Sequence, residues 1–155
     1  MPVRDGARFL EAAVRSVLGQ TFRDFELILW DDGSTDATPG MADALGAADT
    51  RVRVFHGPPR GVAVAMKEAH AHASGRYVGW VDADDVVQPT LLEETVAVLD
   101  AGEGSAQALY WSSAAFSIAD APPVPDAIRL ASGAAEAPTA VAAAGIRDDD
   151  GMLFY

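Results

Sequence analysis

Short apolar runs alternate along this chain with segments whose apolar residues recur at helical spacing. The run Phe25–Trp30 is almost continuously apolar, as expected for a parallel strand covered on both faces. Residues 7–19 carry apolar side chains at positions i, i+4, i+7 and i+8 of one helical face: Leu10, Val14, Val17 and Leu18. This alternation of strands and helices predicts a doubly wound, three-layer α/β/α domain with a mainly parallel sheet.

The rest of the pattern extends the same alternation. Further strands are predicted at Arg51–Phe55, Tyr77–Val81 and Ala108–Trp111. Further helices are predicted from Asp36 and Pro39, over Val62–Ala73 and from Pro89. From Ala119 the chain becomes rich in proline and alanine, with one weak helix predicted over 135–144. We therefore expect one domain over residues 1–118 and a poorly defined segment over 119–155.

Two clusters of aspartates follow two of the predicted strands. Asp31, Asp32 and Asp36 come after Phe25–Trp30, and Asp82, Asp84 and Asp85 come after Tyr77–Val81. Ligands of open α/β sheets bind outside the carboxyl ends of the strands, so both clusters could face one ligand. An alternative for either cluster alone is that its aspartates cap the next helix.

The spacing of Asp82 and Asp84 suggests a metal site. Two carboxylates on a loop after a strand can turn toward one cation, and oxygen ligands suit Mg²⁺ or Mn²⁺. Because these ions retain several waters and often bind substrate phosphates, a site of two carboxylates implies a substrate with a diphosphate group.

Composition excludes several classes of function. The chain has 155 residues, a formal net charge of −12 and no cysteine. Such an acidic chain would be repelled by nucleic acids and anionic membranes, and it cannot form disulfides or thiolate metal sites. No apolar stretch approaches the roughly 20 residues of a membrane span, and no signal-peptide pattern is present. We expect a cytoplasmic chain, including the inner face of a membrane, with no transmembrane segment and no nucleic-acid partner.

Residues 2–100 resemble the GT-A domain of the family 2 glycosyltransferases. The matching motifs occur in the family's order: Pro2-Val3, Gly6, Phe9-Leu10, Ser16-Val17-Leu18, Gln20-Thr21-Phe22, Phe25-Glu26, Asp31-Asp32-Gly33-Ser34-Thr35-Asp36, Arg51-Val52, Arg60-Gly61-Val62-Ala63, Gly75-Arg76-Tyr77 and Asp82-Ala83-Asp84-Asp85. The resemblance implies metal-dependent sugar transfer, with inversion, from a nucleotide-diphospho-sugar donor to a saccharide or lipid-linked acceptor. It leaves the donor, the acceptor and any oligomerisation open.

The resemblance also implies roles for individual residues. Asp32 would hydrogen-bond the base, and Arg60 would approach the phosphates. Asp82 and Asp84 would hold Mn²⁺ or Mg²⁺, and Ala83 lies between them. The base pocket would be lined by Pro2, Val3 and Arg4.

This chain departs from the family's pattern at several positions. Arg4-Asp5 stands where the family usually has an aromatic residue and Asn, so a guanidinium face would have to stack on the base. Lys67 stands where Asn is usual, and a phosphate contact and a solvated lysine are equal alternatives there. The family's first strand ends about where this chain begins, so we expect a chain truncated at both ends. It would lack that strand and most of the acceptor half, and the strand Phe25–Trp30 would face a gap.

The catalytic base is not identified by pattern. Asp148, Asp149 and Asp150 are weak candidates for a general base, and a solvated acidic tail is the favoured alternative for them. His70 and His72 lie two residues apart on a predicted helix, which favours surface or packing roles.

Two further functions compete with sugar transfer. A phosphatase of the haloacid dehalogenase type would use Asp82 as nucleophile and Asp84 as acid and base, but its motif normally opens the domain. A non-catalytic GT-A fragment that binds nucleotide weakly, or not at all, is the other alternative.

Overall fold

The computed structural model describes residues 1–101, 146–147 and 153–154. These residues fall into two compact units, Met1–Val96 and Ala97–Tyr155. The predicted domain boundary at residue 118, the strand Ala108–Trp111, the helix over 135–144 and the candidate bases Asp148, Asp149 and Asp150 all lie outside the described residues.

The first unit is built on a parallel sheet of three strands in the order β1-β2-β3. The strands are β1 (Pro2–Val3), β2 (Leu27–Asp32) and β3 (Val52–Gly57). In the register, Val3 lies beside Asp31 on one edge of β2, and His56 lies beside Asp31 on the other. All three strands therefore end together, at one edge of the sheet.

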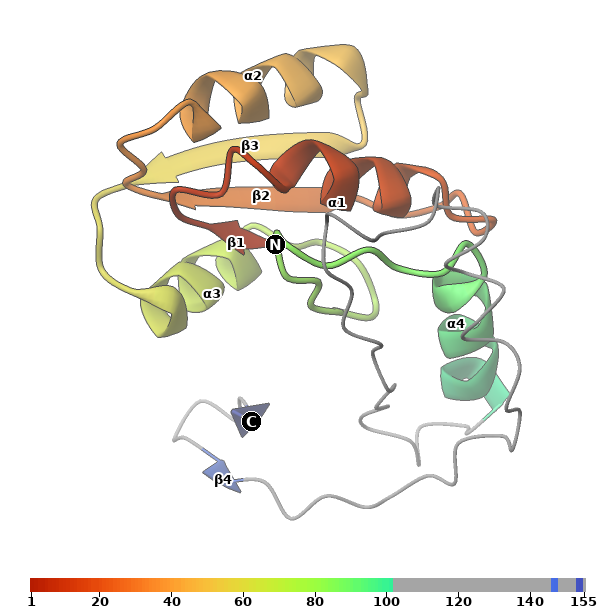
Figure 1. The fold of residues 1–155 in the computed structure, drawn as a ribbon. Coiled ribbons are helices and arrows are strands. Elements are labelled where there is room, and N and C mark those ends of the chain that lie inside the picture. Colours follow the sequence, from red (N-terminus) through yellow and green to blue (C-terminus); the bar gives the residue numbers. More distant parts are fainter. Residues whose placement is uncertain (102–145, 148–152, 155) are drawn as a thin grey trace. The chain divides into compact units, whose positions relative to one another are not determined.

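Helices cover both faces of this sheet (Figure 1). Leu27 and Leu29 point to one face and pack with Leu10, Val14 and Val17 of α1 (Leu10–Leu18) and Ala42 of α2 (Thr38–Ala48). The opposite face carries Trp30 and is covered by α3 (Val62–Ala71), whose Ala65 and Ala69 are buried. The predicted three-layer arrangement is confirmed.

The first strand runs along β2 where we expected a gap. The buried Met1 ammonium donates a hydrogen bond to the Ile28 carbonyl (2.9 Å), and the Trp30 N–H donates to the Met1 carbonyl (3.0 Å). Burial lowers the pKa of this ammonium to about 5, while the negative charge of Asp82 acts in the opposite direction. Met1–Val3 thus continue the ladder of β2.

The strand predicted at Tyr77–Val81 is wrong, because these residues form no regular structure. The described sheet contains β1, β2 and β3 and no pairing with these residues, and an apolar run becomes a strand only when it finds a ladder. Val81, Ala83 and Val87 still pack against the hydrophobic core. The helix predicted from Pro89 is present as α4 (Leu91–Ala101).

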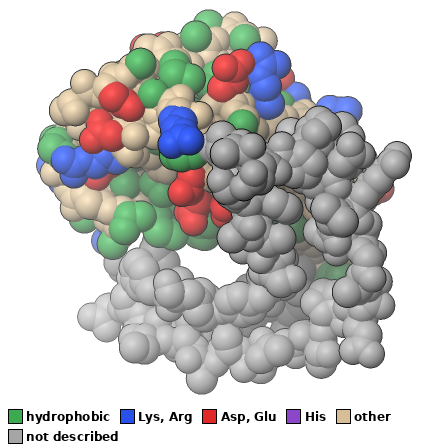
Figure 2. Space-filling model, viewed as in Figure 1, with side chains coloured by type: hydrophobic (Ala, Val, Ile, Leu, Met, Phe, Trp, Pro, Cys, Tyr) green, Lys and Arg blue, Asp and Glu red, His purple; other side chains and the backbone are tan. Residues whose placement is uncertain are grey.

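In the second unit, β4 (Ile146–Arg147) and β5 (Leu153–Phe154) form an antiparallel pair. None of the described helices is long and apolar enough to cross a membrane. Acidic and basic side chains are interspersed over the visible face of the described residues (Figure 2).

Candidate functional site

Asp31 and Asp32 end β2 and point to opposite faces of the sheet. Successive side chains of a strand alternate between its faces, so neighbouring residues have different surroundings. Asp31 meets His56 of β3 and the N–H of Ser34, whereas Asp32 meets the loop that leads into α3. Both residues are buried, with 3% exposure each.

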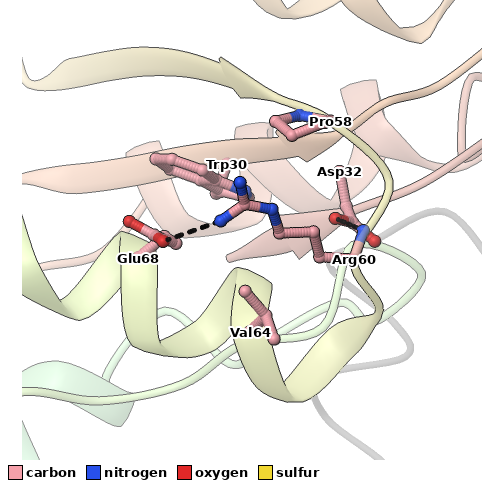
Figure 3. A pocket seen from close by; sticks show the side chains of 6 residues that line it. All are labelled: Trp30, Asp32, Pro58, Arg60, Val64 and Glu68. Carbon is pink, nitrogen blue, oxygen red and sulfur yellow. Dashed lines mark hydrogen bonds and ion pairs between the residues drawn. The ribbon is translucent and has the colours of Figure 1, made fainter.

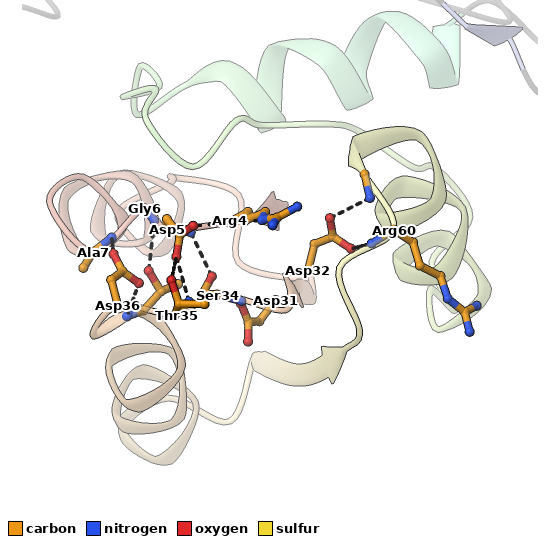
Figure 4. Close-up of polar contacts among 12 residues, drawn as sticks. Arg4, Asp5, Gly6, Ala7, Asp31, Asp32, Ser34, Thr35, Asp36 and Arg60 are labelled. Atoms are coloured by element: carbon orange, nitrogen blue, oxygen red, sulfur yellow. Dashed lines mark hydrogen bonds and ion pairs between the residues drawn. The ribbon is translucent and has the colours of Figure 1, made fainter.

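The carboxylate of Asp32 holds the start of α3. Its Oδ1 accepts the Arg60 N–H and its Oδ2 accepts the Gly61 N–H, both at 2.8 Å (Figure 4). Gly61 precedes α3 with φ of 90°, a conformation that glycine adopts without steric cost. Each carboxylate oxygen has a second lone pair, so Asp32 can accept a further hydrogen bond from a ligand.

A pocket lies beside Asp32 on the α3 side of the sheet. It is lined by Trp30, Asp32, Pro58, Arg60, Val64 and Glu68 (Figure 3). The indole of Trp30 forms an apolar wall, and the guanidinium of Arg60 lies 3.8 Å from the Glu68 carboxylate. The pocket thus combines a flat aromatic surface with an acceptor and a cation.

The loops after β1 and β2 are joined by reciprocal hydrogen bonds (Figure 4). The Asp5 N–H donates to Ser34 Oγ (2.9 Å), and Asp5 Oδ1 accepts the Thr35 N–H (2.7 Å). The Gly6 N–H donates to Thr38 Oγ1 (2.9 Å), and the Ala7 N–H donates to Asp36 Oδ2 (3.2 Å). These contacts, called the loop interlock below, fix both loops at the carboxyl edge of the sheet.

Asp5 adopts the left-handed backbone conformation, with φ of 49°. Asn and Asp are the non-glycine residues that tolerate this region best. Asp5 therefore meets a backbone requirement that the family's usual Asn would also satisfy. Next to it, the Arg4 side chain is exposed, with its Nε 4.0 Å from Asp5 Oδ2.

None of the aspartates of the first cluster is the N-cap of α2: that position is Ala37, and it has no side-chain cap hydrogen bond. Asp36, one residue earlier, contacts the start of the helix. Asp36 Oδ1 accepts the N–H of Thr38, the first residue of α2, at 2.9 Å. Asp31 and Asp32 have no such role, since their hydrogen bonds go to β3 and to the loops beyond β2 and β3.

His56 joins β2 to α2. Its Nδ1 lies 3.0 Å from Asp31 Oδ2 and its Nε2 lies 3.0 Å from Asp43 Oδ1. Hydrogen bonds to Asp31 and then Asp43 raise the pKa of His56. Burial alone would raise the pKa of Asp31, but hydrogen bonds from Ser34 and His56 hold it below its usual value.

The second aspartate cluster lies on a turn in which the Asp85 N–H donates to the Asp82 carbonyl (3.2 Å). The side chains of Asp82, Asp84 and Asp85 are exposed. Partial burial, followed by the charges of Asp82 and Asp84, raises the pKa of Asp85. This crowding of negative charge is the kind that a bound cation relieves.

The donor set fits a hard divalent cation with an incomplete protein shell. Asp82 and Asp84 carry carboxylate oxygens, the type of ligand that Mg²⁺ and Mn²⁺ take. Within the described part of the chain, no three His, Asp or Glu side chains converge on one point. A cation held here would therefore need oxygens from outside these side chains, as substrate phosphates or waters provide.

The other predicted site residues contribute in different ways. Val3 is buried against the core, so its backbone rather than its side chain is available to a ligand, and Pro2 is half-buried beside Trp30. His72 stacks on Phe55 with ring centroids 3.8 Å apart, which confirms a packing role for it.

A model of glycosyl transferase family 2 matches residues 1–115. The chain belongs to this family. Glycosyltransferase GlyG of Streptococcus pneumoniae is 37% identical over 94 residues, which are 60% of this chain and 31% of that protein. Chondroitin synthase of Pasteurella multocida is 36% identical over 93 residues, which are 60% of this chain and 10% of that protein.

Solved structures agree with this family 2 fold. S. aureus TarS 1-349 in complex with UDP-GlcNAc superimposes with a TM-score of 0.61 at 24% identity, over 66% of this chain and 30% of that chain. The likeness, together with the parallel sheet, shows the Rossmann-like GT-A fold. The chain spans about a third or less of the length of these family 2 relatives. The phosphatase alternative finds no support in any of these matches.

Sequence analysis missed two features of this family 2 domain. His56 was given no role, because the two carboxylates that it contacts lie 25 and 13 residues away in the chain. Ser16, Gln20 and Thr21 were recognised as family motifs, but their hydrogen bonds to residues 87–93 were not predicted. The recurrence of these motifs in the family was the available signal.

Proposed function

We propose that this chain binds a nucleotide-diphospho-sugar at the carboxyl edge of β1, β2 and β3 and takes part in transfer of the sugar to an acceptor. The observation that carries the proposal is the pocket beside Asp32, where a buried carboxylate, an indole face and a guanidinium come together. A nucleobase requires such groups, because it has flat faces and polar edges. UDP-sugar binding by TarS, a structural neighbour, supports the same class of donor.

Each residue has a separate part in this proposal. Asp32 accepts a hydrogen bond from the base while its amide contacts to Arg60 and Gly61 hold it in place. Pro2, Val3 and Arg4 are proposed to contact the base from β1, although they are not among the residues that line the pocket beside Asp32, and Val3 would do so through its backbone. The exposed Arg4 guanidinium takes the position of the family's aromatic residue. Arg60 contributes positive charge on the phosphate side.

The acidic loop Asp82–Asp85 faces the diphosphate in this proposal. Asp82 and Asp84 are the proposed ligands of Mn²⁺ or Mg²⁺, with Ala83 between them. A cation there supplies charge neutralisation for a diphosphate leaving group. We propose a saccharide or a lipid-linked saccharide as the acceptor, and transfer with inversion. The general base is not assigned: Asp148, Asp149 and Asp150 are weak candidates for it, and a solvated acidic tail is the favoured interpretation of those residues.

Calorimetric titration with UDP, GDP and dTDP, with and without Mn²⁺, tests this function. We expect at least one nucleoside diphosphate to bind in a Mn²⁺-dependent manner, and Asp84→Ala to abolish that binding. The matched control is Asp24→Ala, which removes an exposed carboxylate before β2, away from the carboxyl edge of the sheet. Binding that is unchanged in Asp84→Ala would sink the metal assignment, and no binding of any diphosphate would sink the function.

A further inference from the structure

The segment after the acidic loop has little structure of its own. Residues 86–90 lie between the turn at Asp82–Asp85 and the first turn of α4, and they belong to neither a helix nor a strand. A segment outside helices and strands has many conformations unless other elements hold it. The position of Asp82 and Asp84 therefore depends on what the following residues contact.

The C-terminal turn of α1 and the residues that follow it make those contacts. The Val87 N–H donates to Ser16 Oγ (3.1 Å), and the Thr21 N–H donates to the Pro89 carbonyl (2.7 Å). Thr21 Oγ1 also donates to Glu93 Oε2 (2.7 Å). The first of these bonds lies three residues after Asp84, within about 10 Å along an extended chain.

Gln20 is the central residue of this contact. It is fully buried, with 0% exposure, and its Nε2 donates to the Gln88 carbonyl (2.5 Å) and to the Ser16 carbonyl (3.3 Å). Its Oε1 accepts the Leu92 N–H (2.9 Å). A flipped amide would place oxygen against both carbonyls and nitrogen against an N–H, so the network allows one orientation. One side chain thus fixes residues on both sides of Pro89.

We propose that Ser16, Gln20 and Thr21, called the α1 anchor here, position the acidic loop Asp82–Asp85 for a metal-bound diphosphate. The inference rests on the proposed function of that loop. The anchor residues touch neither metal nor ligand and act through the backbone of residues 87–92. Ser16 and Gln20 are buried polar side chains bonded to the backbone of this segment, and losing one leaves buried N–H or C=O groups unpaired. Thr21 is exposed and adds its bonds to Pro89 and Glu93.

Two variants loosen the anchor to different degrees. Gln20→Met keeps the length of the side chain and removes its bonds to Gln88, Leu92 and the Ser16 carbonyl. Ser16→Ala removes the acceptor of the Val87 N–H and, within α1, the bond from Ser16 Oγ to the Ala13 carbonyl. Val52→Ala is the matched control, since it truncates a buried side chain at the start of β3 and leaves the hydrogen bonds of the anchor in place. Hydrogen exchange of the Val87 and Leu92 amides reports the anchor without any ligand.

The deciding measurement is UDP affinity of the full chain with and without Mn²⁺. We expect Gln20→Met to lower Mn²⁺-dependent affinity roughly 10- to 100-fold, the range seen when groups that orient metal ligands are removed. Ser16→Ala should lower it less, and both variants should leave the metal-free affinity for UDP unchanged. Val52→Ala should leave the enhancement by Mn²⁺ as in the wild type, although it lowers stability.

The outcomes separate the two proposals. Suppose that the wild type binds UDP more tightly with Mn²⁺, and that Gln20→Met keeps this enhancement although its Val87 and Leu92 amides exchange faster. That result overturns the positioning role alone. Equal losses with and without Mn²⁺ also overturn it, since they indicate general destabilisation. A wild-type chain that binds no UDP with Mn²⁺ overturns the proposed function and the inference that rests on it.

Discussion

At the scale of single residues, the adjacent carboxylates Asp31 and Asp32 have different partners because successive side chains of a strand point to opposite faces of the sheet. Asp32 faces α3 and the pocket, with both oxygens bonded to backbone N–H groups. Asp31 faces α2 and is bonded to His56 and Ser34, so it shapes the loop rather than the pocket. From the sequence, the family resemblance assigned base binding to Asp32, but the contacts of Asp31 with His56 and Ser34 were not predicted.

His56 makes stability depend on pH. Because Asp31 and Asp43 raise its pKa in the folded protein, its stabilising contribution is complete below the unfolded value of about 6.5 and is lost as pH rises through the higher folded value. The side chain is 40% exposed, so we expect an effect below about 1 kcal/mol. Urea unfolding between about pH 6 and pH 9 should show the wild type losing stability relative to His56→Gln. A constant difference between the two proteins would contradict this role.

At the scale of elements, α2 contains two glycines in contrasting surroundings. A Cβ added at Gly40 meets no atom within 4 Å, whereas one added at Gly46 lies 2.8 Å from Val54 Cγ2. Replacing glycine by alanine inside a helix favours folding by about 0.5–1 kcal/mol when nothing else changes.

We therefore expect Gly40→Ala to raise the free energy of unfolding by about 0.5–1 kcal/mol. Gly46→Ala should gain nothing or lose stability, because Val54 must move away from the new methyl group. Urea unfolding of the two variants beside the wild type measures both effects, and each variant serves as the control for the other. Equal gains in the free energy of unfolding at the two positions would show that Val54 moves aside for the new methyl group at little energetic cost.

The elements differ in how well their sequence predicts them. The strands β2 and β3 and all four helices from α1 to α4 follow from apolar periodicity, with ends displaced by a few residues. Tyr77–Val81 has an equally suitable composition but forms no strand, because pairing depends on a neighbouring ladder and not on the segment itself. Likewise, the hydrogen bond from the Leu92 N–H to Gln20 Oε1 joins residues 72 positions apart, so the local spacing of residues does not predict it.

At the scale of the whole molecule, the dominant property is charge. The formal net charge of −12 on 155 residues produces repulsion that is stronger in the compact state than in the extended one. Raising NaCl from about 0.01 M to 0.1 M shortens the Debye length from about 30 Å to about 10 Å, which screens this repulsion. The same screening weakens exposed ion pairs such as Arg15 with Glu11, but these pairs contribute little to the free energy of unfolding.

We expect the melting temperature at pH 7 to rise over this range of salt, measured by scanning calorimetry. Choline chloride at the same ionic strengths is the control, because it screens charge without offering a small cation to Asp82 and Asp84. A similar rise in both salts supports screening of the whole surface. A melting temperature that stays level or falls with salt would show that local ion pairs outweigh net repulsion.

The loop interlock limits how this domain can be recombined with its relatives. Asp5, Gly6 and Ala7 come from the first loop, whereas Ser34, Thr35 and Asp36 come from the second loop and Thr38 is the first residue of α2. A chimaera with its crossover anywhere between residues 8 and 33 takes the two halves from different parents, and its hydrogen bonds then depend on both parents having matching residues. Exchange of donor preference between family members is therefore best attempted with residues 4–38 transferred as one block.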